Sequence, residues 1–304
     1  MKLASMSTLH VAGLADGRFD FTRGGKPASL VVIGGPPGSG KTALLEAIAA
    51  TKEKIAPYGA SPGREIIARD HARAKVTIDW WLDEGELAIA GGEALRPSEA
   101  LFGSVEPAGE TAWDDGLHMV LGRWSTDRPK VEYLHHPRAI LPTSVIASAS
   151  VSSRNRLGRH NAKFDGMVAT ILGWTDNRDK LEAFHRAFGF LCSSKRFAGI
   201  VVRGSARLLG FASTTKPDQP WVSLDELSAS EHQAALFAAT FTVLDLERSV
   251  VLIDVPEAAL PSDKVVDFVG ALTTLGEDKQ LIVATSSREL QGYSEALVID
   301  LGKV

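Results

Sequence analysis

A glycine-rich segment between two apolar runs is the part of this sequence best suited to chemistry. It matches the phosphate-loop pattern Gly-x4-Gly-Lys-Ser/Thr, with the apolar run 31–33 before it and Leu44 and Leu45 after it. Glycines that adopt positive φ let successive N–H groups point into one concavity in front of a helix N-terminus, and such a concavity attracts a phosphate. The residues expected to bind a nucleotide here are Gly35, Pro36, Pro37, Gly38, Ser39, Gly40, Lys41 and Thr42.

Lys41 and Thr42 have different expected roles in this loop. The lysine ammonium would reach the β- and γ-phosphates, and the threonine hydroxyl would hold Mg²⁺, a hard cation that takes few protein ligands. A second magnesium ligand is expected at Asp254, because the apolar run 249–253 ends in this carboxylate. A central parallel strand delivers such a side chain to its C-terminal edge.

The expected elements place the phosphate loop and Asp254 on the same sheet. Apolar periodicity and turn residues divide the chain into alternating strands and helices. We expect strands at 8–14 and 18–22, a helix at 43–54, a hairpin of strands at 75–82 and 86–90, a loop at 91–115, a strand at 130–138, a helix at 176–192, a strand pair at 197–202 and 206–213, a helix opening at Ser223, a strand at 249–254, a helix at 265–275, and strands at 280–285 and 296–300.

Composition limits the class of protein. The 304 residues are 44% hydrophobic and 23% charged, which is ordinary for a soluble globular chain. A net charge of −4 argues against a surface devoted to nucleic acid. Cys192 is the single cysteine, so an internal disulfide is excluded, and no Cys/His cluster has metal-ligand spacing. Without a signal peptide or an apolar run of membrane length, we expect a cytoplasmic protein.

Some aromatic and histidine residues allow two interpretations. Phe19 or Phe21 could stack on a nucleotide base, although an aromatic side chain on a strand is more often part of the core. His135 and His136 are adjacent, and adjacent strand residues point to opposite faces, so they cannot readily share one metal ion. We therefore expect each histidine to be structural or to line a polar surface.

A basic stretch after residue 150 also has two interpretations. It could contact a nucleic-acid backbone, or it could be the solvated surface of a lobe, which the negative net charge favours. The residues concerned are Arg154, Arg156, Arg159, His160 and Lys163.

Three further segments resemble motifs of a known family. Leu227-Ser228-Ala229-Ser230-Glu231 is similar to a signature Leu-Ser-x-Gly-Glu, Asp254-Val255-Pro256-Glu257 is similar to Asp-Glu-Pro-Glu, and 282–287 is similar to a switch-histidine strand. The order of these motifs resembles the ABC-type ATPase heads of the structural-maintenance-of-chromosomes, RecF-like and overcoming-lysogenisation-like groups, over nearly the whole chain. The resemblance implies ATP as the nucleotide. It also implies that Ser228 and Ser230 contact ATP held by a second head.

The chain departs from this family at three positions. Val255 stands where the catalytic glutamate is usual, Ser286 where a switch histidine contacts the γ-phosphate, and Ser230 where the signature has a glycine. Loss of a general base typically costs about 10²–10⁴-fold in rate. Because of these three departures, hydrolysis is expected to be slow or absent. Glu257 and Ser286 remain as candidate catalytic residues.

The resemblance implies an α/β fold of the ABC P-loop type, with a mainly parallel central sheet, an antiparallel β lobe and a small helical lobe. We expect one head, with a nucleotide core at 1–60 and 245–304, a β lobe at about 61–145 and a helical lobe at about 146–244. It would be a slow ATPase or an ATP-gated switch that forms a homodimer, or pairs with a related head, and controls a separate effector. The family link suggests DNA repair or phage defence. The alternatives are an inactive regulatory or scaffold subunit and, third, the ATPase subunit of a membrane transporter.

Overall fold

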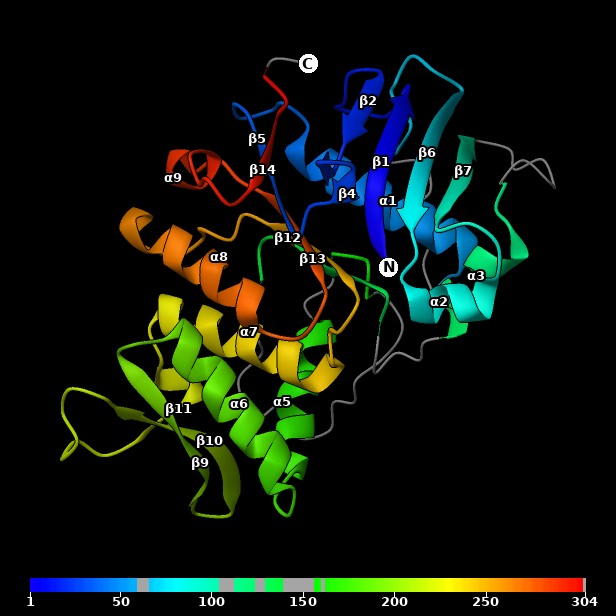
Figure 1. Cartoon of the computed structure of the whole chain (residues 1–304). Coiled ribbons are helices and arrows are strands. Elements are labelled where there is room, and N and C mark those ends of the chain that lie inside the picture. Colours follow the sequence, from blue (N-terminus) through cyan, green and yellow to red (C-terminus); the bar gives the residue numbers. More distant parts are fainter. Residues whose placement is uncertain (59–65, 104–111, 124–128, 139–155, 160–161, 303–304) are drawn as a thin grey trace.

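A five-stranded parallel sheet forms the centre of the computed structural model (Figure 1). The structure describes residues 1–58, 66–103, 112–123, 129–138, 156–159 and 162–302. The sheet has the order β14-β5-β13-β12-β8, and all its neighbouring strands are parallel. Its strands are β5 (Leu30–Gly34), β8 (Val131–Leu134), β12 (Val250–Asp254), β13 (Gln280–Ala284) and β14 (Leu297–Asp300). The expected α/β fold with a parallel central sheet is confirmed.

The apolar runs of the central strands are explained by burial on both faces of this sheet. In β5, Val31 and Ile33 belong to one hydrophobic core, while Leu30 and Val32 belong to a second core on the opposite face. Alternate residues of β12 and β13 divide in the same way. Continuous apolar strands are typical of parallel sheets that are covered on both sides.

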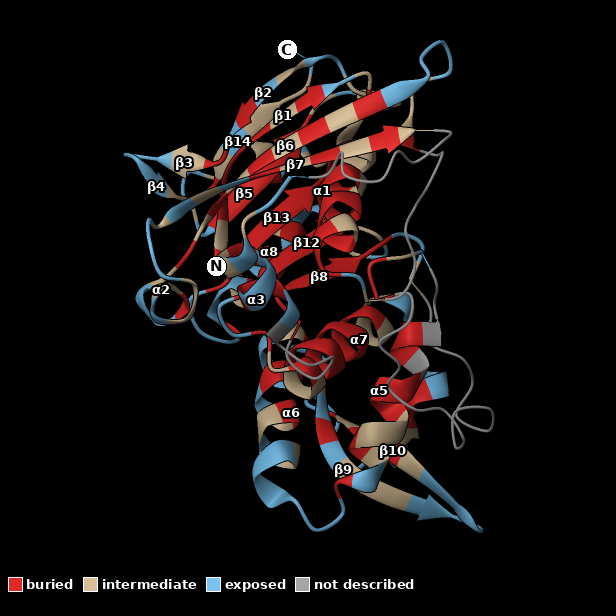
Figure 2. Cartoon of the chain, turned by 90° about the vertical axis from the view of Figure 1, so that its right-hand side faces the viewer, coloured by how far each residue is buried: buried red, intermediate tan, exposed pale blue. Residues whose placement is uncertain are grey.

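The first face is covered by helix α1 (Lys41–Ile55) and, beyond it, by an antiparallel sheet of order β2-β1-β6-β7 (Figure 2). That sheet contains β1 (Lys2–Leu9), β2 (Gly17–Asp20), β6 (Arg73–Trp81) and β7 (Leu95–Gly103). Helix α1 contacts strands of both sheets and is buried nearly all round. The small elements β3 (Thr22–Arg23), β4 (Lys26–Pro27), α2 (Glu84–Ala90) and α3 (Asp115–Arg123) complete this side.

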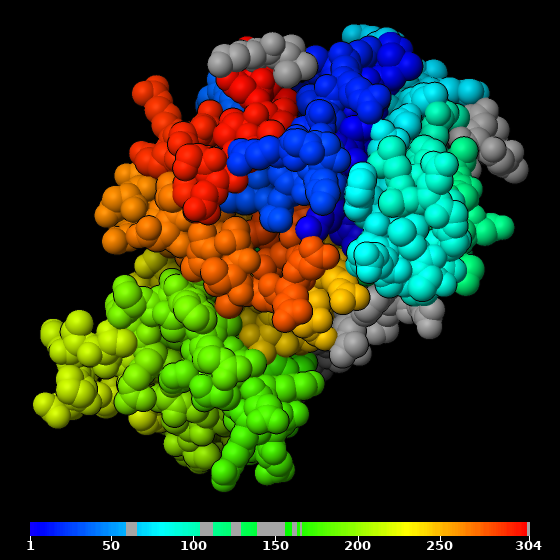
Figure 3. Space-filling model, in the orientation of Figure 1, coloured from blue at the N-terminus to red at the C-terminus, as the bar shows by residue number. Residues whose placement is uncertain are grey.

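The second face is covered by helices, which continue into a projecting lobe (Figure 3). In this lobe α7 packs against α5 and α6, and Phe184, on α6, meets Phe197 edge-on with a centroid separation of 4.8 Å. The elements on this side of the central sheet, including those of the lobe, are α5 (Ala162–Gly173), α6 (Arg178–Leu191), β9 (Lys195–Arg203), β10 (Ala206–Ser213), β11 (Val222–Ser223), η2 (Leu224–Glu226), α7 (Ala229–Leu244), η3 (Ser262–Lys264), α8 (Val265–Thr274) and α9 (Arg288–Gln291).

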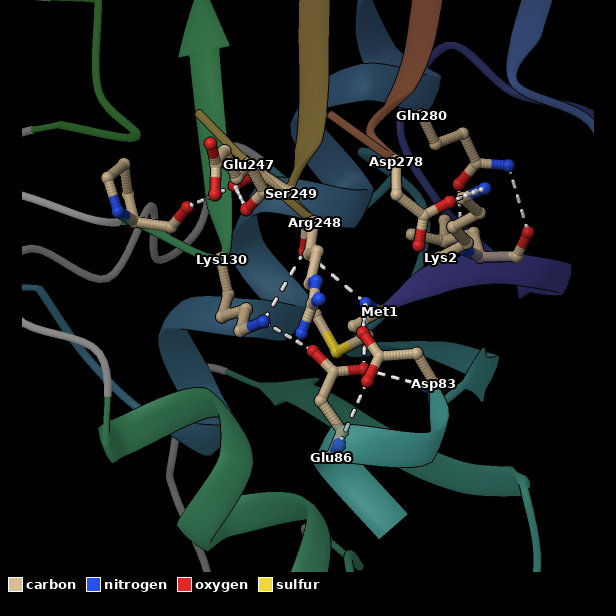
Figure 4. A network of polar contacts seen from close by, with 12 residues as sticks. Met1, Lys2, Asp83, Glu86, Lys130, Glu247, Arg248, Ser249, Asp278 and Gln280 are labelled. Carbon is tan, nitrogen blue, oxygen red and sulfur yellow. Dashed lines mark hydrogen bonds and ion pairs between the residues drawn. The ribbon is translucent and has the colours of Figure 1, made fainter. Parts of the chain in front are cut away.

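A buried polar network joins the antiparallel sheet to the parallel one (Figure 4). Glu86 of α2 accepts a hydrogen bond from Lys130, just before β8, and lies 2.7 Å from the backbone nitrogen of Met1. The side chain of Gln280, at the start of β13, bonds both the N–H and the carbonyl of Leu3, at 2.7 and 3.1 Å. These contacts fix the N-terminal end of β1 against the sheet that carries the candidate site.

One expected hairpin is wrong. Residues 86–90 belong to helix α2 rather than to a strand, because Asp83 and Glu86 form a capping box with two hydrogen bonds of 2.9 Å. The strand that follows β6 and pairs with it is β7, which falls where we expected a loop. The pairing runs from Trp81 opposite Leu95 to Arg73 opposite Gly103.

The core interpretation of Phe19 and Phe21 is confirmed, because they are 2% and 0% exposed and neither can stack on a bound base. Both surface interpretations of the basic stretch are wrong for two of its residues. Arg156 and Lys163 are 0% and 3% exposed, so they are not part of a solvated or nucleic-acid-binding patch. Arg159 is exposed and pairs with Glu46. Arg154 and His160 lie outside the described residues.

Arg156 and Lys163 are buried because both side chains have hydrogen-bond acceptors inside the protein. Arg156 donates from Nε to Glu132 on β8 at 3.0 Å, and Glu132 is itself 0% exposed. Lys163 donates to three backbone carbonyls, including those of Tyr133 and Gly158. Burial lowers the pKa of Lys163 to about 7. The basic stretch therefore anchors its segment to the parallel sheet.

Candidate nucleotide site

The phosphate loop has the backbone that its glycines predict. β5 ends at Gly34 and α1 begins at Lys41, with Gly40 as a left-handed N-cap at φ 92°. Gly35 and Gly38 also have positive φ, at 134° and 82°. Only glycine adopts these angles at low cost, so successive loop amides can turn towards one side. The hydroxyl oxygen of Ser39 is buried and has no hydrogen-bond partner among the described residues.

Lys41 lies against the loop that it is expected to serve. Its ammonium donates to the carbonyls of Gly35 and Pro36, at 2.9 and 2.8 Å. Both acceptors belong to the loop itself, so the positive charge stays at the concavity. A phosphate in the loop would meet this ammonium without a large movement of the chain.

The connection between β1 and β2 braces the phosphate loop. A Cβ atom on Gly40 would lie 2.1 Å from the carbonyl oxygen of Gly13 and 2.8 Å from Leu14 Cδ2. Gly13 in turn packs near Ala43, because a Cβ on Gly13 would lie 3.7 Å from the Cβ of Ala43. Gly40 is therefore required for space as well as for φ. No local pattern indicates this contact, because Asp16-Gly17 indicates only a turn.

Thr42 and Asp254 meet although 212 residues separate them. The Thr42 hydroxyl lies 3.0 and 3.1 Å from the two carboxylate oxygens of Asp254, at the end of β12. Asp254 is 4% exposed. Burial raises the pKa of this carboxyl, and the Thr42 hydrogen bond and nearby Arg159 and Arg138 act against that rise. A hydroxyl beside a shielded carboxylate is a donor set that fits Mg²⁺, which would offset the cost of burying the negative charge.

Arg138 holds the end of β12 in place, and sequence reasoning missed it. Its guanidinium donates to the carbonyls of Asp254 at 2.6 Å and Val255 at 2.9 Å, and also to those of Leu134 and His135 after β8. Burial lowers the pKa of Arg138 to about 10, so it remains charged at neutral pH. No local pattern marks an arginine that binds carbonyls on two strands.

The structure brings Glu257 and Ser286 together. Glu257 Oε1 accepts a hydrogen bond from the backbone N–H of Ser286 at 2.8 Å. Among the described residues, its other oxygen, Oε2, is buried and has no hydrogen-bond partner. Between Asp254 and Glu257 the chain turns through Val255, which has φ 48°, an unusual value for a β-branched residue.

The signature segment lies elsewhere on the chain. Ser228 caps α7, which begins at Ala229 rather than at Ser223, and its hydroxyl accepts from Glu231 N at 3.4 Å. Ser230 lies 3.4 Å from the Ser228 hydroxyl. In the part of the chain that the structure describes, no hydrogen bond joins either serine to the phosphate loop. Gln233 of α7 donates to the carbonyl of Pro256 at 2.7 Å, which links this helix to the turn after β12.

The two histidines do not form a metal site. His135 is buried and stacks on Phe164 with a centroid separation of 5.7 Å, whereas His136 is exposed. Among the described residues, no group of three or more His, Cys, Asp or Glu side chains could hold a metal ion. No described helix is long and apolar enough to cross a membrane.

Comparisons with known proteins support the fold. No protein-family model and no curated protein matches the chain. Among solved structures, an Smc head bound to the C-winged helix domain of ScpA superposes with a TM-score of 0.61 at 15% identity, covering 99% of this chain and 94% of that one. The SMC head domain from Thermotoga maritima gives 0.54 at 13%, with coverage of 99% and 94%. An Smc head with an extended coiled coil, bound to the C-terminal domain of ScpA and derived from Pyrococcus furiosus, gives 0.58 at 12%, with coverage of 98% and 93%. The chain therefore has an SMC-head-like α/β fold.

Proposed function

We propose that this protein is an ABC-type head that binds ATP and Mg²⁺ and acts as a slow ATPase or an ATP-gated switch. The observation that carries the proposal is the contact between Thr42 and Asp254 beside a glycine-rich loop. Two oxygen ligands from distant parts of the chain meet where the loop amides and Lys41 would hold a triphosphate. The SMC-like fold supports the same assignment.

Each part of the site has a distinct task in this proposal. The loop amides and Lys41 hold the phosphates, and Thr42 and Asp254 hold the metal ion. When bound, Mg²⁺ neutralises charge on the phosphates. Arg138 positions Asp254 by fixing the backbone at the end of β12.

We further propose that the complete site needs a second head. Ser228 and Ser230 make hydrogen bonds within their own lobe, so within one chain they are free of the phosphate loop. A homodimer, or a pair with a related head, would bring one signature segment over the ATP of the other. The division into a nucleotide core, a β lobe and a helical lobe is part of this proposal.

The partner of the head is a separate question. Two similar structures are Smc heads, one bound to the C-winged helix domain of ScpA and the other to the C-terminal domain of ScpA. By analogy, a separate effector chain would read the nucleotide state of this head. Work on DNA, such as repair or phage defence, remains a proposal that rests on the family resemblance.

A non-hydrolysing regulatory subunit is the second candidate function. Val255 favours it, because its side chain can neither accept a proton nor orient water. In that case ATP would hold two heads together without turnover. Phosphate release by the purified protein separates the two candidates.

Isothermal titration calorimetry with ATP and Mg²⁺ tests the shared premise. Lys41→Ala should weaken ATP binding by about 10- to 100-fold, because it removes a charge-assisted contact of about 1.5–3 kcal/mol. Lys26→Ala, at an exposed lysine of β4, is the matched control and should bind normally. Thr42→Ala should abolish the gain in affinity that Mg²⁺ provides, whereas Thr42→Ser should keep it.

The expected dimer is tested by light scattering with ATP. Ser230→Arg should bind ATP but remain a monomer, because the new side chain would block close approach of a second head. Wild-type protein that takes up no ATP, or Lys41→Ala protein that binds as well as wild type, would refute the assignment.

A further inference from the structure

We propose that Glu257, three residues after Asp254, is the carboxylate that accepts the proton of the attacking water during ATP hydrolysis. The inference rests on the proposed ATP site and adds a catalytic residue to it. It assigns the base to a position two residues beyond Val255, where the usual glutamate is missing.

The backbone makes a tight turn after β12, and this turn brings Glu257 back towards the end of the neighbouring strand β13. Val255 adopts φ 48°, and Ala258 N donates to Val255 O at 3.2 Å, which closes a tight turn. Arg138 binds Val255 O, and Gln233 binds Pro256 O at 2.7 Å. A β-branched residue in this conformation is strained, and such strain persists where surrounding contacts over-determine it, commonly at functional sites.

The two carboxylate oxygens of Glu257 have different environments. Oε1 is fixed by the N–H of Ser286 at 2.8 Å. Within the described residues, Oε2 is shielded from solvent and has no hydrogen-bond donor. A buried polar atom without a partner is uncommon in proteins and needs an explanation. An oriented carboxylate with one enclosed oxygen that lacks a donor is suited to accept a hydrogen bond from a single enclosed water.

The order of the strands places this carboxylate beside the phosphate loop. Ala284, the last residue of β13, pairs with Ile33 of β5 on one side and with Asp254 of β12 on the other. The phosphate loop, Ser286 and Glu257 therefore follow three adjacent strands at the same C-terminal edge. Ligands of open parallel sheets bind at this edge. The Glu257–Ser286 pair therefore lies at the sheet edge from which the phosphate loop and Asp254 also emerge.

The reaction balances with ATP and water as the only reactants. The water oxygen forms a bond to the γ-phosphorus, and the bond from that phosphorus to the β–γ bridging oxygen breaks, so ADP leaves with the electron pair. One proton of the water passes to Glu257 Oε2 and is later released to solvent. Lys41 and the loop amides hold the phosphate groups during this step.

Glu257→Gln is the critical variant, because an amide oxygen can still accept from Ser286 N but the side chain cannot take a proton. We expect phosphate release to fall by about 10²–10⁴-fold, with ATP affinity unchanged. Glu289→Gln is the matched control, since Glu289 is an exposed carboxylate that accepts from the Ser287 hydroxyl nearby.

The outcomes separate this inference from the proposed function. A Glu257→Gln protein that hydrolyses ATP at the wild-type rate overturns the role of Glu257, and so does wild-type protein that binds ATP but releases phosphate no faster than Lys41→Ala. A wild-type protein that binds no ATP refutes the proposed function itself. Unchanged melting temperature and ATP affinity show that Glu257→Gln has not simply damaged the fold.

Discussion

Alanine at Gly40 or at Gly38 gives a direct test of how the phosphate loop is braced. Both glycines have positive φ, at 92° and 82°, so alanine is strained at either position. The surroundings differ. A Cβ on Gly38 would have no heavy atom within 4 Å, whereas a Cβ on Gly40 would lie 2.1 Å from the carbonyl oxygen of Gly13. The two variants therefore share the backbone strain and differ in the steric clash.

The expected losses of stability follow from these two terms. A left-handed conformation costs an L-residue about 1–2 kcal/mol, so Gly38→Ala should lower the free energy of unfolding by that amount. Gly40→Ala must also displace the Gly13 backbone by at least about 1 Å to restore normal contact. Overpacking of this kind typically costs a further 1–3 kcal/mol, so we expect a total of about 2–5 kcal/mol.

Urea denaturation followed by circular dichroism, without nucleotide, measures this difference. Removing nucleotide matters because a Cβ on either glycine would also affect phosphate binding. Leu14→Ala in the Gly40→Ala background should recover only part of the loss, since the clash with the Gly13 carbonyl remains. Equal destabilisation by the two single variants would show that the connection between β1 and β2 does not brace the loop, and would refute this reasoning.

Two further predictions concern the buried charges near β8. Arg156→Met should destabilise the protein by about 3–5 kcal/mol, because it leaves Glu132 buried without its partner. The double variant Arg156→Met/Glu132→Leu should cost far less. If urea denaturation shows that the double variant loses as much stability as the two single variants added together, the coupling is contradicted. Burial lowers the pKa of Lys163 from 10.5 to about 7, so between these values the unfolded chain binds more protons than the folded one. Stability from this group should therefore be complete above about pH 10.5 and be lost as the pH falls through about 7. Lys163→Met should flatten that rise in stability between pH 7 and 9, and an unchanged slope in urea titrations would exclude this role for Lys163.

The elements predicted correctly are those with strong local signals. The run before the phosphate loop and the run that ends in Asp254 are continuous, apolar and followed by distinct turn residues, and both are strands of the parallel sheet. The pair β9 and β10 around Gly204 was also expected, and the structure confirms it. In these segments periodicity and turn chemistry agree, and tertiary contacts do not override them.

The errors occurred where local and tertiary preferences compete. Strand β7 contains Pro97 and Glu99, which made its segment look like a loop, yet its alternate residues Ser98, Ala100 and Phe102 are buried against the core. Pairing along the whole length of β6 makes it a strand. The pair Asp83 and Glu86, three residues apart, is a local sequence signal for the capping box that starts α2.

The sequence alone determined the phosphate loop, because glycine conformation, helix initiation and strand hydrophobicity are properties of neighbouring residues. It also determined that Asp254 ends a buried strand. Three contacts arise only when the chain is folded: Thr42 touches Asp254, Gly13 lies on Gly40, and Glu257 binds the backbone of Ser286. These contacts depend on which strands lie side by side in the sheet. Strand order arises from packing the two cores together and leaves no periodic signal along the chain.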